Sequence, residues 1–151
     1  MVAEVRMLTL AECAAAYPQL RFAVGDHRSS GVVAESRADE TYDLAGTGKL
    51  LLGLTLAELG PRDVGFLARP LTVDAEHRAR ARTGTLRLMS GELQLSVEDA
   101  VSLVLSTGDG ACALALLDFT ASEGLDLLAE ARSLASELGL DAVQLSGLEA
   151  G

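Results

Sequence analysis

The run LLLGLTLAEL at residues 50–59 constrains the fold more than any other feature of the chain. Its apolar residues lie on nearly every side of a helix, which is the pattern of a helix buried on all faces. Thr47 stands where a helix cap is expected, and Gly60-Pro61 stops the helix. Such a helix needs other elements packed around it. The 151 residues, 49% of them apolar, are enough to build that core as one domain over 1–151.

Periodicity, capping residues and turn residues predict the elements that surround this helix. Helices are expected over residues 8–17, 97–106 and 122–138, strands over 20–24 and 32–35 joined as a hairpin, and irregular chain over 61–92. The capping box Ser96-Val97-Glu98-Asp99 opens the second of these helices, and Gly139 ends the third.

Residues 97–119 allow two interpretations. Val101 to Leu105 and Ala111 to Leu117 are either two helices or two strands joined at Gly108-Asp109-Gly110, because Asp-Gly is a strong hairpin turn. With the first hairpin and the last helix, the strand interpretation gives a small module of the roadblock type, a dimerising scaffold. Periodicity alone does not choose between the two.

The charge balance excludes several classes of partner. Lys and Arg number 12 and Asp and Glu 22, so the formal net charge is −10. Nucleic acids and anionic membranes need a cationic face, so neither is expected as the partner. No apolar run approaches the roughly 20 residues of a membrane span. The first residues lack the continuous apolar stretch of a secretory signal, so the chain is expected in the cytoplasm.

The two cysteines, Cys13 and Cys112, are isolated and far apart. They have neither metal-ligand spacing nor a disulfide framework, and both are expected to be buried thiols. His27 and His77 have no second ligand at metal spacing and are expected on the solvated surface. No metal and no cofactor is therefore expected.

Residues 46–49, Gly-Thr-Gly-Lys, match only the Gly-Lys step of a phosphate-binding loop. Such a loop needs a glycine where Asp43 stands and a hydroxyl residue where Leu50 stands. A nucleotide site is therefore excluded.

Read with its surroundings, the same segment resembles the nucleophile segment of class A β-lactamases and related penicillin-recognising serine hydrolases. The resemblance is carried by residues 37–52 (RADETYDLAGTGKLLL) and 82–99 (RTGTLRLMSGELQLSVED). Residues 105–113 stand where the family has its S-D-N loop, and 122–143 resemble the helix and turn before the omega loop. The resemblance implies helices over 97–119.

Against that family pattern, the catalytic positions are altered. The nucleophilic serine of S-x-x-K is replaced by Gly46, and the S-D-N loop reads Gly108-Asp109-Gly110. Lys49 and Asp109 are kept. The resemblance implies that Asp109 ties backbone together and that Lys49, without a nucleophile, has no obvious task.

Thr47, Glu149 and a run of arginines are further candidates for a functional role. Thr47 is interpreted as a helix cap rather than a substitute nucleophile. Glu149 falls near the family's omega-loop glutamate, the general base, but stands at the end of the chain. The arginines from Arg78 to Arg87 are interpreted as a solvated face that pairs with surplus carboxylates, the sharper alternative being an acidic ligand or partner.

The expected fold is therefore α+β: a truncated β-lactamase-like domain made of a helical part, a two-stranded hairpin and an N-terminal helix, without the family's C-terminal strands. The expected function is that of a catalytically inactive β-lactamase-like protein acting as a binding or interaction module. A divergent serine-hydrolase-like enzyme and a roadblock-like scaffold are the alternatives. Because the hairpin has too few strands to cover itself, a homodimer is expected, with Phe22, Val24, Val32 and Val33 near the interface.

Overall fold

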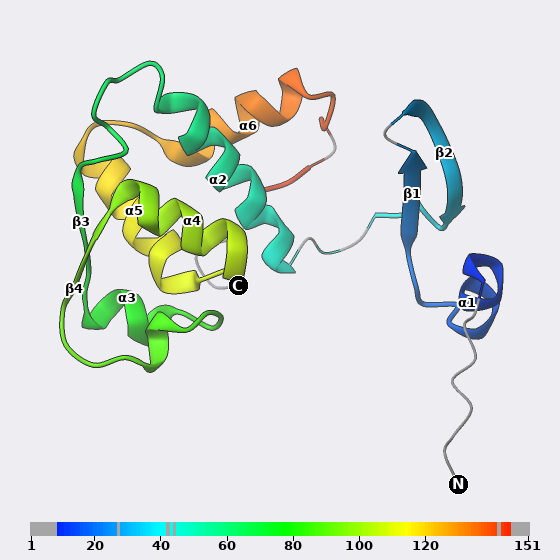
Figure 1. The fold of residues 1–151 in the computed structure, drawn as a ribbon, viewed down its shortest axis with the longest axis horizontal. Helices are drawn as coiled ribbons and strands as arrows, with labels where there is room; N and C mark the ends of the chain where they lie inside the picture. The colour runs from blue at the N-terminus through cyan, green and yellow to red at the C-terminus, as the bar shows by residue number, and fades with distance from the viewer. Residues whose placement is uncertain (1–8, 27, 42, 44, 142, 146–151) are drawn as a thin grey trace, which may run out of the picture. The chain divides into compact units, whose positions relative to one another are not determined.

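The computed structural model describes residues 9–26, 28–41, 43, 45–141 and 143–145. The chain divides into two units, residues 1–43 and residues 44–151. Both contain helices and antiparallel strands, so the fold class is α+β (Figure 1).

Unit 1 consists of a short helix and a hairpin. Helix α1, Leu10–Ala16, begins with a capping box between Thr9 and Glu12. Strands β1, Phe22–Asp26, and β2, Ser29–Ser36, pair antiparallel, and the pairing is irregular near Gly25. The hairpin predicted for this region is confirmed.

The hairpin has no core of its own. None of the residues from 9 to 43 whose side chains the structure describes is buried. Polar contacts hold its ends instead: Arg37 donates to the Pro18 carbonyl at 2.6 Å and pairs with Glu40, which also pairs with Arg21 at 3.2 Å. A two-stranded hairpin without a buried face is marginally stable in water.

Unit 2 holds the other helices and a second, smaller sheet. Its described elements are α2 (Gly48–Leu59), β3 (Pro70–Val73), α3 (Ala75–Arg80), η2 (Leu86–Leu88), β4 (Leu93–Ser96), α4 (Val97–Thr107), α5 (Gly110–Ser122) and α6 (Leu127–Glu137), preceded by the turn η1 (Ala45–Thr47). Helix α2 lies where the all-apolar run predicts it, with Leu51, Leu52 and Leu56 in the core. The expectation that it is buried on all faces is wrong, because Leu50 and Leu54 are 49% and 48% exposed.

Helix α5 forms the centre of unit 2. Most of its first seven residues, from Gly110 to Leu116, are Ala or Leu, and all are buried. It contacts β3, α3, η2, α4 and α6, and Figure 1 shows α4 beside it. Residues 97–122 are thus helical apart from the turn at Gly108 and Asp109, so the β-hairpin interpretation is wrong. The roadblock-type fold needs two strands in this region, so the structure does not support it.

Residues 61–92 contain more structure than the sequence predicts. Strand β3 pairs with β4 in antiparallel register, from Pro70 opposite Ser96 to Val73 opposite Leu93. Helix α3 follows β3 and is capped by Asp74. The expectation of irregular chain is wrong here because two four-residue strands are too short to give a clear alternation. Helix α6 also begins later than predicted, after its cap at Asp126.

Candidate functional site

The turn between α4 and α5 places a carboxylate in the interior. Gly108 ends α4 with a left-handed φ of 62°, and Asp109 caps α5 with its side chain. Its Oδ1 accepts the backbone N–H groups of Ala111 and Cys112 at 3.0 and 3.1 Å. A glycine readily adopts the left-handed conformation needed at such a helix end. The backbone bonding expected of Asp109 is confirmed.

The other oxygen of Asp109 holds a distant segment. Oδ2 accepts from the backbone N–H groups of Thr85 at 2.7 Å and Leu86 at 2.9 Å, and the residue is fully buried. Gly84 has a φ of +88°, and a Cβ there would lie 2.2 Å from Oδ2. Only glycine lets the 83–86 segment approach this closely. Four backbone donors thus satisfy one buried carboxylate.

Lys49 lies in the first turn of α2 and is 1% exposed. Its Nζ donates to Thr83 Oγ1 at 2.6 Å and to the Gly108 carbonyl at 3.3 Å. Thr83 Oγ1 in turn donates to the same carbonyl at 2.8 Å. Burial lowers the pKa of Lys49, and the negative charge of Asp109 opposes that change. Lysine, threonine and aspartate therefore connect α2, the 83–86 segment and the α4–α5 turn.

Cys112, in the first turn of α5, is fully buried as predicted. Burial raises the pKa of its thiol to about 12, with added contributions from the charge of Asp109 and a hydrogen bond to it. The side chain therefore stays a thiol at neutral pH and is not a nucleophile. Cys13 is half-buried rather than fully buried.

The candidate residues are partly brought together. Lys49, Gly108 and Gly110 contact Thr83, which sequence reasoning missed, and Asp109 binds the neighbouring Thr85 and Leu86. Gly110 N–H donates to the Thr83 carbonyl at 3.1 Å.

Gly46 lies in the η1 turn just before α2. Cβ atoms built at Gly46 and at Gly108 would meet nothing within 4 Å. Thr47 occupies the cap position of α2, but its side chain makes no capping hydrogen bond. Glu149 lies outside the described residues.

His77 is buried, so its expected place on the surface is wrong. Its Nδ1 accepts the backbone N–H of Asp74 at 3.2 Å, and its Nε2 lies 3.1 Å from Asp118 Oδ2. Nδ1 also lies 2.9 Å from Asp74 Oδ1, so the ring is held between two carboxylates. His27 lies outside the described residues, and no cluster suited to a metal ion occurs in the part of the chain that is described.

The arginines divide into paired and unpaired groups. Arg69 pairs with Asp63 at 2.8 Å and Glu123 at 2.5 Å. Arg78 donates to the Val73 carbonyl. Among the described residues, the carboxylate pairing expected for the stretch from Arg78 to Arg87 is limited to one ion pair, Arg80 with Glu76 at 3.8 Å.

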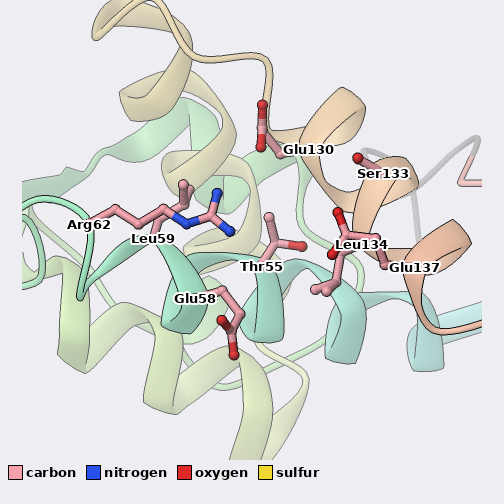
Figure 2. A pocket seen from close by; sticks show the side chains of 8 residues that line it. All are labelled: Thr55, Glu58, Leu59, Arg62, Glu130, Ser133, Leu134 and Glu137. Atoms are coloured by element: carbon pink, nitrogen blue, oxygen red, sulfur yellow. The ribbon is translucent and has the colours of Figure 1, made fainter.

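A small pocket of about 30 Å³, here called the groove, lies between α2 and α6 (Figure 2). Glu58 and Arg62 line it from the α2 side and Glu130, Ser133 and Glu137 from α6. The candidate residues of the sequence do not line this groove. Its carboxylates do not converge on a common point that would suit a metal ion.

No protein-family model, no curated protein and no solved structure matches the chain. In the described residues, no helix is both long enough and apolar enough to cross a membrane.

Proposed function

We propose that this chain is a catalytically inactive relative of the class A β-lactamases and acts as a binding or interaction module. One observation carries the proposal. The two charged residues kept from the family pattern, Lys49 and Asp109, are 1% and 0% exposed and bind neighbouring parts of the chain. Gly46 stands at the position of the nucleophile.

The chemistry of acyl transfer supports this proposal. A serine-type hydrolase needs a hydroxyl group that a base can deprotonate beside the substrate. Gly46 offers no hydroxyl group, Lys49 donates its protons to Thr83 and Gly108, and Asp109 accepts four backbone N–H groups. Asp109 is therefore engaged in structure rather than aimed at a ligand.

Intact-mass spectrometry after incubation with a penicillin tests the absence of catalysis. The wild-type chain should gain no adduct, and an adduct of one drug mass would overturn the proposal. Gly46→Ser is the matched variant, because its Cβ meets nothing within 4 Å and should leave the fold intact. Little activity is expected from it, since Gly108 and Gly110 still lack the family's groups and such groups act as a unit.

We propose that unit 1 forms the interface of a homodimer. Val24, Val32 and Val33 of the hairpin are 38%, 61% and 67% exposed. Among the described residues, no third strand pairs with this two-stranded sheet. A two-fold dimer that pairs one edge of each copy would give a four-stranded sheet in which those edge N–H and C=O groups are satisfied.

A second candidate function is residual acyl transfer by Thr83. The observation that favours it is the 2.6 Å contact between Thr83 Oγ1 and Lys49 Nζ, because a lysine with a lowered pKa is a competent base. The hydroxyl proton of Thr83 points to the Gly108 carbonyl, however, which favours the structural role. A penicillin adduct that disappears in Thr83→Val would support this enzyme function.

A further inference from the structure

The segment of residues 80–89, here called the cationic loop, is an isolated positive region in an acidic chain. It contains Arg80, Arg82 and Arg87 and no acidic residue, whereas the whole chain has a net charge of −10. Arg82 and Arg87 are both exposed, and within the described residues neither has a carboxylate partner. Arg80 has only the 3.8 Å contact with Glu76. The positive charge of the cationic loop is therefore largely unpaired among the described residues, although the chain has a surplus of carboxylates.

Two apolar side chains lie beside these charges. Leu88 is 75% exposed and Met89 is 48% exposed. The turn η2 explains this exposure, since a 3₁₀ helix turns a third of a revolution per residue. Leu86 points into the core and is 7% exposed, so Arg87 and Leu88 are directed away from it. Arginine and methionine are both enriched at protein–protein interfaces.

The backbone of the cationic loop is held in place before any partner arrives. Asp109 accepts the N–H groups of Thr85 and Leu86, Lys49 binds Thr83 Oγ1, and Gly110 N–H binds the Thr83 carbonyl. A loop fixed in this way loses little conformational entropy on binding, which favours affinity. The residues that resemble catalytic ones thereby fix the position of an exposed surface.

We infer that the cationic loop is a docking surface for an acidic segment of a partner protein that also carries apolar side chains. Carboxylates would pair with Arg82 and Arg87, and an apolar side chain would cover Leu88 and Met89. Charge complementarity selects this partner. The inference rests on the proposed function as a binding module and names its partner class.

A short segment suits the loop better than an extended polyanion. The rest of the chain has nine basic and 22 acidic residues. A bilayer or a nucleic acid presents negative charge over a wide area and would be repelled by that remainder. An acidic segment that covers only the cationic loop avoids most of this repulsion, because charges are screened beyond about 8 Å at physiological ionic strength.

The test uses fluorescence anisotropy with a labelled peptide of repeated Glu-Leu-Glu-Gly units and a matched peptide with glutamine for glutamate. Arg82→Gln/Arg87→Gln should weaken binding of the acidic peptide at least about tenfold, and Leu88→Ser should weaken it less. Arg62→Gln/Arg132→Gln is the charge-matched control, because both arginines are exposed, lie outside the loop and have no carboxylate partner among the described residues. It should bind within about twofold of wild type.

Several outcomes would overturn the inference. They are no binding of the acidic peptide up to about 1 mM, equal weakening by the control pair, or equal binding of the glutamine peptide. Tighter binding of phosphatidylserine vesicles or single-stranded DNA, lost in Arg82→Gln/Arg87→Gln, would replace the partner class. The penicillin experiment separates the two proposals: an adduct refutes inactivity alone, whereas absent peptide binding without an adduct refutes the docking surface alone.

Discussion

The replacement of Asp109 by alanine is the sharpest test of how unit 2 is held together. The variant removes the acceptor of four backbone N–H groups in a residue that is fully buried. Loss of a helix cap costs about 1 kcal/mol. A buried N–H group left without an acceptor costs about 1–3 kcal/mol, and Leu86 N–H is buried.

Together these effects predict that Asp109→Ala lowers the free energy of unfolding by about 2–4 kcal/mol. Asp126→Ala is the matched control, since Asp126 caps α6 and accepts only the Ala129 N–H at 3.0 Å. That control should cost about 0.5–1 kcal/mol. Guanidinium unfolding followed by far-ultraviolet circular dichroism measures both variants.

Equal destabilisation by the two alanine variants would refute the reasoning. If Asp109→Ala does not fold, Asp109→Asn gives the readout. Its amide oxygen can still accept from Ala111 and Cys112, but its NH₂ group would face the N–H groups of Thr85 and Leu86. Asn should therefore be less stable than Asp, and equal stability would show that the second carboxylate oxygen contributes nothing.

Three further predictions concern thiol chemistry, the buried charge and assembly. In the native chain a thiol reagent at pH 8 should modify Cys13 and spare Cys112, and both should react after unfolding. The pKa of Cys112 is raised from its ordinary value of 9.0 to about 12, so its stabilising contribution is present below pH 9 and is lost between pH 9 and 12. Wild type should therefore lose more stability than Cys112→Ala over that pH range, as measured by alkaline unfolding. The pKa of Lys49 is lowered, so its charge costs stability at neutral pH and this cost is relieved as the pH rises. The stability of wild type relative to Lys49→Met should therefore increase as the pH rises from 7 towards 10.5, the ordinary pKa of lysine, and a constant difference would contradict this. Light scattering at micromolar concentration should give a dimer that added salt does not weaken, and a monomer of 15.7 kDa in low and high salt would rule it out.

Local signals explain which parts of the fold could be predicted from the sequence. The capping box at Ser96 and Asp99 and the glycine at the end of α4 act within a few residues, so they fix that helix from the sequence alone. The apolar run at the start of α5 has no polar face, and its periodicity therefore fits a strand or a helix equally. The capping hydrogen bonds that Asp109 accepts from the first turn of α5 favour the helix over the strand.

Long-range partners explain what sequence reasoning missed. The bond from Lys49 to Thr83 joins residues 34 positions apart, and no local pattern announces it. The missing metal-ligand spacing of His77 predicts a surface position, whereas His77 completes the capping box of α3 and lies beside Asp118 of α5. The lysine and aspartate of the candidate site were identified from the family resemblance, but the threonine between them was not.

The pairing of β3 with β4 brings together the two ends of the long segment that connects these strands. Val73 lies opposite Leu93, so the intervening residues leave and re-enter the fold at one place. Extending a loop whose ends are already joined adds little closure entropy, about 0.6 kcal/mol for a doubling of its length. The exposed turn at Gly91 follows the Thr85 and Leu86 contacts of Asp109 in the chain and is therefore a position where foreign sequence can be grafted while α5 keeps its surroundings.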